Sequence, residues 1–216
     1  MRPAPGASER RSASWSRATE ATTTATYTWD VFSTLDGYGS DVDGADWGGY
    51  WSKQGPELLE HRAALLAPEQ RLVFGATTFR ETAAILGGFP PEALDEWNRR
   101  SLRLPATVIS STLEDSLGWA DAEILRGDGV EIVRRLKQES SLPLLSLASM
   151  TLNWSLLAAG LVDVMRVTVF PVVSGRTGTS PILRGADDLD LELLGSRSFD
   201  GRAVELVYRP ALRAGS

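Results

Sequence analysis

Small and hydroxyl-bearing residues follow four short apolar runs of this sequence. Small side chains let the backbone approach a ligand, and hydroxyls beside the free amides of a helix start suit phosphate oxygens. Each group alone is also typical of ordinary helix capping by Ser or Thr. If the four groups lie at the same edge of one sheet, together they indicate a ligand that carries phosphate. The groups are Thr34-Leu-Asp-Gly37, Gly75-Ala-Thr-Thr78, Ser110-Ser-Thr112 and Ala148-Ser-Met-Thr151.

Asp36 is the only acid within these four groups. Its Asp-Gly pair is a common turn signal, so Asp36 can be a turn residue and nothing more. A carboxylate beside a ligand can also move a proton or accept a hydrogen bond from the substrate. We therefore predict Asp36 as the catalytic residue. The second pair, Asp200-Gly201, lies between two late strand patterns and predicts only a hairpin turn.

The apolar patterns alternate between strand and helix, which predicts a mainly parallel α/β sheet with helices on both faces and a C-terminal antiparallel hairpin. Ligands of such sheets bind beyond the carboxyl ends of the strands. Asp128 and Glu131 have the spacing of a capping box at the third helix. The expected strands are 27–32, 71–74, 106–110, 122–125, 144–147, 164–173, 189–194 and 203–208, and the expected helices are 56–66, 91–100, 129–139 and 150–159.

Length and composition exclude several classes of function. We expect a disordered tail over residues 1–25, rich in Ser, Thr, Ala and Arg, and a single domain over 26–212. A net charge of −6 without a long basic cluster argues against nucleic acid or a membrane surface as partner. The chain has no cysteine and one histidine, His61, so we expect no metal site. These features suit a cytoplasmic protein that binds a small molecule.

The segment 41–51, DVDGADWGGYW, combines aromatic and acidic residues in an expected loop. Trp47, Tyr50 and Trp51 can stack on a flat heterocycle, and we predict Trp47 and Trp51 as substrate-binding. A dimer contact or a plug over the sheet edge explains the same residues equally well. The acidic residues lack the spacing of a calcium-binding loop, which favours a solvated loop.

The order of motifs resembles the dihydrofolate reductase-like superfamily. It is most similar to the reductase domain of the riboflavin-pathway deaminase–reductases and to stand-alone bacterial dihydrofolate reductase family proteins. The resemblance covers about residues 27–210, and its most specific part is the run from GLVD to FPVVSG. The matching pieces are FSTLDGYGS (32–40), LVFGATTFRE (72–81), PATVISSTL (105–113), EIVRRLKQE (131–139), LLAAGLVD (156–163), VTVFPVVSGRTG (167–178) and FDGRAVELVYRP (199–210).

The resemblance implies a homodimer that binds NADPH and transfers hydride to a pyrimidine-like or pterin-like ring, or to another C=N or C=O group. Asp36 matches an aspartate near substrate and nicotinamide. NADH, a flavin or a deazaflavin in place of NADPH stays an alternative. The implied cofactor-binding residues are Gly39 and Ser40 in the loop that lines the nicotinamide pocket, Gly75, Thr77 and Thr78 at the phosphates, Ser110, Ser111 and Thr112 at the adenosine ribose and its 2′-phosphate, and Ser149, Met150 and Thr151 at the pyrophosphate; Thr34 is among the cofactor-binding residues without a place of its own.

Three departures from the family pattern concern this cofactor site. One is Trp154, which stands where similar stand-alone proteins often carry an arginine. Ala76 replaces an arginine that would pair with phosphate. Ala148 replaces a glycine, which costs about 1 kcal/mol or more if the backbone there needs a positive φ. They support an alternative hypothesis, a non-catalytic homologue that binds its ligand with a degraded cofactor site. Asp36 and the Ser/Thr groups support the reductase.

Overall fold

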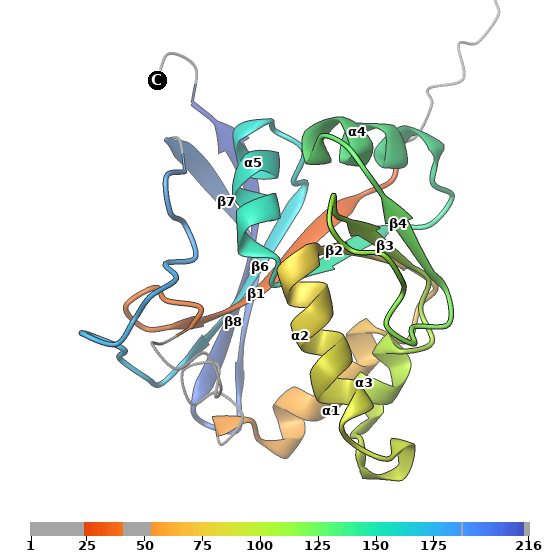
Figure 1. Ribbon diagram of the computed structural model, residues 1–216. Coiled ribbons are helices and arrows are strands. Elements are labelled where there is room, and N and C mark those ends of the chain that lie inside the picture. The colour runs from red at the N-terminus through yellow and green to blue at the C-terminus, as the bar shows by residue number, and fades with distance from the viewer. Residues whose placement is uncertain (1–23, 41–52, 187, 214–216) are drawn as a thin grey trace, which may run out of the picture.

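A computed structural model describes residues 24–40, 53–186 and 188–213. Within these residues eight strands form one sheet in the order β4-β3-β2-β5-β1-β6-β8-β7, and helices cover both of its faces (Figure 1). The strands are β1 (Tyr27–Thr34), β2 (Arg71–Gly75), β3 (Ala106–Ile109), β4 (Ala122–Leu125), β5 (Leu144–Leu147), β6 (Val164–Phe170), β7 (Leu189–Phe199) and β8 (Ala203–Leu212). The helices are α1 (Pro56–Leu65), α2 (Ala76–Gly87), the 3₁₀ helix η3 (Pro91–Ala93), α3 (Glu96–Ser101), α4 (Gly129–Glu139) and α5 (Met150–Ala158).

Strand pairing confirms the predicted sheet. Each neighbouring pair from β4 to β6 is parallel, whereas β8 is antiparallel to both β6 and β7. The carboxyl ends of β1, β2, β3 and β5 therefore meet at one edge of the sheet. The four hydroxyl-rich groups begin at these ends.

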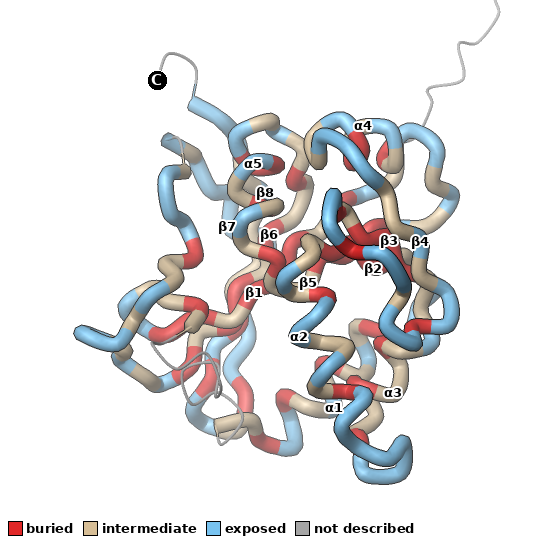
Figure 2. Tube along the Cα trace, viewed as in Figure 1, coloured by how far each residue is buried: buried red, intermediate tan, exposed pale blue. Residues whose placement is uncertain are grey.

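Two hydrophobic cores lie on opposite faces of the sheet, and the central strands are the most deeply buried (Figure 2). On one face Tyr27, Trp29 and Val31 pack with residues of α4 and α5. On the other face Phe74 of β2 packs with Phe79 of α2 and with residues near α3. Alternate residues of β1 point to opposite faces, so Asp30 and Phe32 lie on the face that α1, α2 and α3 cover.

Most of the expected elements are present, with several differences in their bounds. β7 and β8 extend to Phe199 and Leu212, beyond the expected ends at 194 and 208. The family resemblance implies a helix that opens at Gly75–Thr78, and α2 is that helix. The expected helix 91–100 is interrupted. Leu94 is extended and Asp95 caps α3 by accepting a hydrogen bond from the Asn98 N–H at 2.8 Å. The expected strand 164–173 stops at Phe170 because Pro171 follows and has no N–H for the sheet. The predicted cap at Asp128 is confirmed, since its carboxylate accepts from the Glu131 N–H at 3.0 Å.

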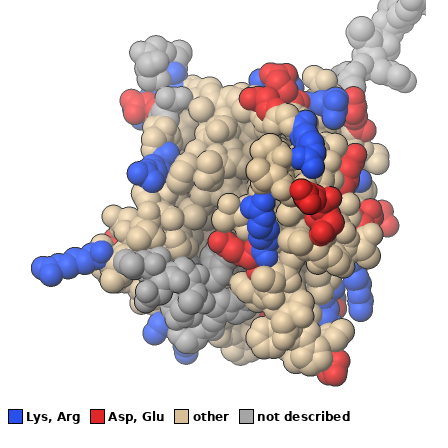
Figure 3. Space-filling view, viewed as in Figure 1, with Lys and Arg blue, Asp and Glu red and all other residues tan. Residues whose placement is uncertain are grey.

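Charges of both signs lie side by side on the face shown in Figure 3, and no patch of one sign covers that face. Within the described part of the chain, no helix is long and apolar enough to span a bilayer.

Candidate active site

Three helices begin around one groove at the carboxyl edge of the sheet. The groove has a volume of about 600 Å³. Its lining includes Ala76 and Thr77 at the start of α2, Gly129 at the start of α4, and Met150 and Thr151 at the start of α5. No side chain caps the start of α2 or of α5, so their first N–H groups remain available. Convergent helix starts provide amide donors and positive partial charge, a combination that favours an anionic ligand.

The groove collects part of the predicted cofactor site. The predicted residues that line it are Ser40, Gly75, Thr77, Thr78, Ser149, Met150 and Thr151. The Ser149 hydroxyl also accepts from the Gly75 N–H at 3.1 Å, and the Ser149 N–H donates to the Thr78 hydroxyl at 3.2 Å. These two bonds join the loop after β5 to the start of α2. Trp154 also lines the groove and donates its indole N–H to the Ile182 carbonyl at 2.8 Å.

Ala148 and Ser149 have left-handed backbone conformations, with φ of 50° and 42°. The sequence comparison with the family raised this possibility for Ala148, which stands where glycine is usual. Side chains other than that of glycine are disfavoured in this region by about 1–2 kcal/mol. The loop is therefore strained at the point where it lines the groove.

Other predicted cofactor residues lie outside the groove. Thr34 is buried, and its hydroxyl accepts from the Tyr38 N–H at 2.9 Å, which stabilises the turn after β1. Ser110 closes its own loop by accepting from the N–H groups of Thr112 and Leu113 at 3.2 and 2.9 Å. Ser111 and Thr112 are exposed. The cofactor roles of these four residues stay predictions.

Asp36 lines neither the groove nor the pocket described below. Its exposed carboxylate accepts from the backbone N–H groups of Ser174 and Gly175 at 3.0 and 2.8 Å. Hydrogen bonds from Thr34 and from Gly175 lower the pKa of Asp36 to about 2. This geometry makes Asp36 a connection between two loops, and its catalytic role stays a prediction. Trp47 and Trp51, the predicted substrate-binding residues, lie outside the described residues.

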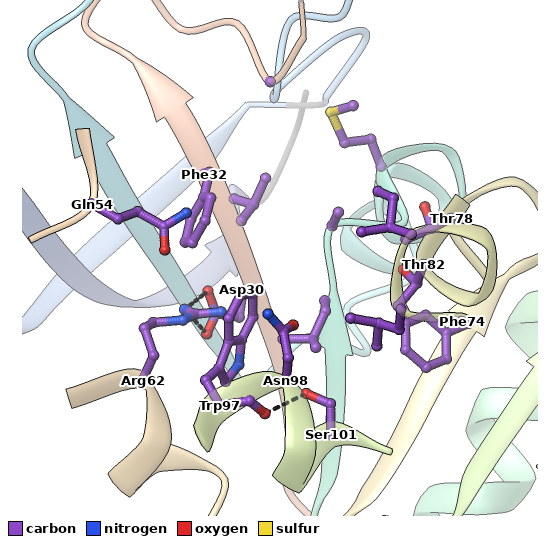
Figure 4. A pocket seen from close by; sticks show the side chains of 17 residues that line it. Asp30, Phe32, Gln54, Arg62, Phe74, Thr78, Thr82, Trp97, Asn98 and Ser101 are labelled. Carbon is purple, nitrogen blue, oxygen red and sulfur yellow. Dashed lines mark hydrogen bonds and ion pairs between the residues drawn. The ribbon is translucent and has the colours of Figure 1, made fainter. Parts of the chain in front are cut away.

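A second, smaller cavity of about 90 Å³ lies between β1 and α2, above α3. In Figure 4, Phe32 and Arg62 stand on one side, Thr78 and Thr82 on the other, and the carboxamide of Asn98 points into the space between them. We call this cavity the ring pocket, after the aromatic rings of Phe32 and Trp97 in its wall. It is lined by Asp30, Val31, Phe32, Gly39, Gln54, Arg62, Phe74, Thr78, Thr82, Ile85, Leu86, Trp97, Asn98, Ser101, Leu147, Ala148 and Met150.

A buried ion pair forms one wall of the ring pocket. Arg62 of α1 donates from Nη1 to both carboxylate oxygens of Asp30, at 2.8 and 2.7 Å, and the two side chains are only 3% and 2% exposed. The Arg62 guanidinium also lies 4.8 Å from the centre of the Phe32 ring and 4.7 Å from that of Trp97. Arginine stacks well on aromatic faces. The pair and the two rings therefore hold one another in place.

The groove and the ring pocket meet. Thr78, Ala148 and Met150 line both of them. Gly39, which lines the ring pocket, touches the same junction, since a β-carbon there would stand 2.8 Å from the Met150 sulfur. A ligand in the groove can thus present one end to a ligand in the pocket.

The sequence motifs do not include the ring pocket's main residues, which are Asp30, Gln54, Arg62, Trp97 and Asn98. One signal was available, because Asp30 interrupts the apolar positions of the strand Tyr27–Phe32. A carboxylate in the middle of a buried strand needs a partner or a function. Its partner Arg62 could not be chosen from sequence, because several arginines lie on comparable helices.

Two carboxylates, those of Glu81 and Asp128, line the groove, whereas no Lys or Arg of the described residues does. Burial raises the pKa of Glu81. A phosphate in this groove would therefore depend on backbone amides and hydroxyls, because the described lining offers it no cation. Across 24–40, 53–186 and 188–213 no cluster of three His, Cys, Asp or Glu side chains is arranged to hold a metal ion.

Comparison with known proteins places this architecture in a family. Among solved structures, a riboflavin biosynthesis protein from Shewanella sp. PV-4 matches with a TM-score of 0.69 at 22% identity, over 86% of this chain and 99% of that one. The deaminase/5-amino-6-(5-phosphoribosylamino)uracil reductase from Thermotoga maritima matches with a TM-score of 0.60 at 15% identity, over 87% of this chain and 57% of that one.

Dihydrofolate reductase from Enterococcus faecalis, solved with NADP(H), matches with a TM-score of 0.57 at 13% identity, over 86% of this chain and 96% of that one. At these identities the likeness establishes the fold. A search of curated proteins gave no match. The family model described as the RibD C-terminal domain matches residues 25–204. The chain therefore belongs to the RibD C-terminal domain family, whose fold is that of the dihydrofolate reductases.

Proposed function

We propose that this protein is a nicotinamide-dependent reductase of a small ring, or of another C=N or C=O group. The dinucleotide would occupy the groove and the substrate the ring pocket. The observation that carries this proposal is the junction at Thr78, Ala148 and Met150, where a groove suited to phosphate meets a largely apolar pocket. The reductases among the structural relatives support the reaction type.

The residues of the groove fit an anionic dinucleotide through their backbone. The N–H groups at the starts of α2 and α5 would bind phosphate oxygens, with the hydroxyls of Thr77 and Thr151 beside them. The bound nicotinamide would supply a hydride. NADPH is the expected form of the cofactor. NADH is the alternative, and it is favoured because the described lining of the groove offers no Lys or Arg to bind the additional phosphate of NADPH.

The walls of the ring pocket would orient the substrate and exclude water. Phe32, Phe74 and Leu86 contribute apolar surface, and the ordered Asp30–Arg62 pair fixes the position of the Trp97 ring. Nicotinamide chemistry requires the protein to orient the two rings and to handle one proton. Asp30 is the carboxylate in this wall, whereas the predicted acid Asp36 lies outside it. Asp30→Asn and Asp36→Asn variants, compared by turnover and by cofactor affinity, would distinguish the two carboxylates.

A cofactor titration tests the proposal. Purified protein is titrated with NADPH and with NADH by calorimetry, and saturable binding of at least one is expected. Glu81→Gln should tighten binding several-fold, because it removes a carboxylate from the groove. Glu139→Gln, at the exposed far end of α4, is the matched control and should leave the affinity unchanged. If neither dinucleotide binds at millimolar concentration, the alternative is favoured: a non-catalytic homologue that binds a ligand in its pocket.

The homodimer expected from the family resemblance is a second part of the proposal. The edge strand β7 exposes Leu191, Leu193 and Leu194 to solvent, and the backbone along its outer side pairs with no described strand. A second copy of the chain could cover both features. A cytoplasmic location remains a prediction of the sequence.

A further inference from the structure

The loop between β5 and α5 keeps two consecutive residues, Ala148 and Ser149, in the left-handed region. Such a conformation is disfavoured roughly ten-fold at each residue, so the surrounding structure must hold it. Ser149 is the N-cap of α5, but its hydroxyl accepts from the Gly75 N–H at 3.1 Å and does not cap the helix. Within the described part of the chain, the first N–H groups of α5 therefore have no side-chain cap, and the residues that carry them, Met150 and Thr151, line the groove.

Asn153 of α5 holds the carbonyl groups of both left-handed residues. Its Nδ2 donates to the Ala148 carbonyl at 3.2 Å, to the Ser149 carbonyl at 3.1 Å and to the Ser146 hydroxyl at 2.9 Å. Each carbonyl takes a second donor as well. The Trp29 indole N–H donates to that of Ala148 at 2.7 Å, and the Asn153 backbone N–H donates to that of Ser149 at 3.0 Å. Since a carbonyl oxygen has two lone pairs, both are used, and the direction of both peptide groups is fixed.

Tyr27 of β1 fixes the orientation of the Asn153 carboxamide. The Tyr27 hydroxyl donates to Oδ1 of Asn153 at 2.9 Å, which turns Nδ2 toward the two carbonyls. Burial raises the pKa of the Tyr27 phenol well above its usual range, so the hydroxyl keeps the proton that it donates. A buried polar network that is fully paired rigidifies its surroundings. The side chains of this network have no exposed surface: Tyr27, Trp29, Ser146 and Asn153.

We infer that Asn153 is a positioning residue for the dinucleotide: through the carbonyls of Ala148 and Ser149 it holds the loop in the conformation that leaves the first amides of α5 free for phosphate. Because Asn153 has no exposed surface, it acts through the loop and not on the ligand. The inference rests on the proposed function for the identity of that ligand. Amides that are aimed before the ligand arrives lose no affinity to the ordering of the loop.

Two variants of the network test the inference by calorimetric titration with NADH and NADPH. Asn153→Leu keeps the size of the side chain and removes the donor, and it should weaken binding about ten-fold, because only the fraction of molecules with a competent loop can bind. Tyr27→Phe removes the hydroxyl that orients the carboxamide, and it should weaken binding about three-fold, as the loss of one modest hydrogen bond does. Since Tyr27→Phe changes the core least, it decides the question if Asn153→Leu does not fold. Unchanged affinity in the folded variants would overturn the inference.

A matched control separates positioning from a general loss of stability. Lys137 is also buried and also donates to a backbone carbonyl, that of Leu161, at 3.0 Å. It lies in the last turn of α4, whereas the groove lies at the first turn of that helix. Lys137→Met should therefore destabilise the protein and leave the affinity for NADH unchanged. A loss of affinity equal to that of Asn153→Leu would overturn the inference.

Relief of the backbone strain gives a rescue experiment. Glycine at position 148 lowers the cost of the left-handed conformation, so Ala148→Gly added to Asn153→Leu should restore the affinity about three-fold. The same change should add less to the natural protein, in which Asn153 already holds the loop. A restoration that is absent, or no larger than the gain in the natural protein, would overturn the inference.

A measurement without ligand keeps this inference separate from the proposed function. Amide hydrogen exchange followed by NMR reports on the Ser149 N–H, which donates to the Thr78 hydroxyl at 3.2 Å. In Asn153→Leu its exchange should accelerate about ten-fold more than that of the amides in β1, as local opening of the loop requires. Faster exchange in a protein that binds no dinucleotide would retain Asn153 as the residue that holds the loop and remove the reductase. Dinucleotide binding that Asn153→Leu leaves unchanged would retain the reductase and overturn the inference.

Discussion

At the scale of single residues, Asp36 shows how a turn residue acquires a structural role from residues distant in sequence. Its carboxylate joins the turn after β1 to Ser174 and Gly175, 138 and 139 residues further along the chain. The resemblance to reductases assigned it to catalysis. The structure instead provides two backbone donors for its charged form, which no sequence pattern reports.

This arrangement predicts a pH dependence. The pKa of Asp36 is about 2 in the folded protein, against 3.8 for the unperturbed group. A carboxyl with a lowered folded pKa contributes stability that is fully present above the unfolded pKa and is lost as the pH falls through the folded pKa. Asp36→Asn should therefore be less stable than the natural protein at pH 6, and the difference should shrink between pH 4 and pH 2. Urea unfolding across this range measures it. A difference that is constant with pH would contradict the predicted role of the charge.

Ala148 carries a second prediction at this scale. Because its φ of 50° disfavours a β-carbon, Ala148→Gly should stabilise the protein by about 1 kcal/mol, after the entropy of glycine in the unfolded chain is subtracted. Ser149→Gly is the comparison, since it relieves similar strain but loses the hydroxyl that accepts from Gly75. We expect little net change there. Thermal unfolding of both variants checks the contrast, and a destabilised Ala148→Gly would exclude strain at this position.

At the scale of elements, the sequence predicted the sheet well, whereas it did not predict the residues of the ring pocket. Parallel strands were predictable because alternation and helix starts are local patterns, as at Asp128 before α4. The groove followed from topology, since parallel strands end at one edge. The ring pocket did not, because it requires α1 to place Arg62 against Asp30 on β1. That placement depends on packing between two residues that lie 32 positions apart, and neither residue belongs to a motif.

The start of α1 depends on the C-terminal hairpin. Its N-cap, Gly55, has no side chain to offer, and Asp200 in the β7–β8 turn accepts from the N–H groups of Glu57 and Leu58 at 3.1 and 3.2 Å. A β-carbon on Gly55 would stand 2.2 Å from the Asp200 carboxyl carbon, so only glycine fits there. Asp200 has a φ of 52°. The Asp200-Gly201 pair, which the sequence predicted only as a hairpin turn, therefore also caps the start of α1.

Substitutions at Asp200 test this cap. Asp200→Gly keeps the left-handed backbone and removes the carboxylate, and it should destabilise the protein by about 1 kcal/mol, as loss of a helix cap does. Asp200→Asn retains an acceptor and tolerates the same backbone, so it should cost less. Chemical unfolding of the two variants gives the difference. Equal stabilities would show that the carboxylate does not cap α1.

At the scale of the whole molecule, the edge strand β7 is the surface through which we propose that two copies of the chain form a homodimer. Leu193 is 55% exposed, and Leu191 and Leu194 lie beside it on β7. An edge strand with exposed apolar side chains tends to pair with another chain. The other edge strand of the described sheet, β4, carries none of the exposed large hydrophobic residues, so we propose the β7 edge as the surface that a second copy would use.

The proposed homodimer predicts a mass in solution twice the 23.4 kDa of the chain. Leu193→Glu should shift the protein toward the monomer, because it places a charge in the contact. Leu117→Glu is the control, since Leu117 is also exposed but lies in a loop on another part of the fold. Sedimentation velocity reports both. A natural protein that sediments as a monomer would contradict the proposed contact.

The link between Asp200 and α1 has a consequence for the order of folding. Residues 56–65 leave the ribosome long before Asp200, and the cap spans 143 positions of sequence. Contacts of such long range form late, because closing a long loop costs entropy before the contact stabilises anything. Since α1 also supplies Arg62, the closing of the last hairpin adds to the order of one wall of the ring pocket, which the ion pair with Asp30 already holds.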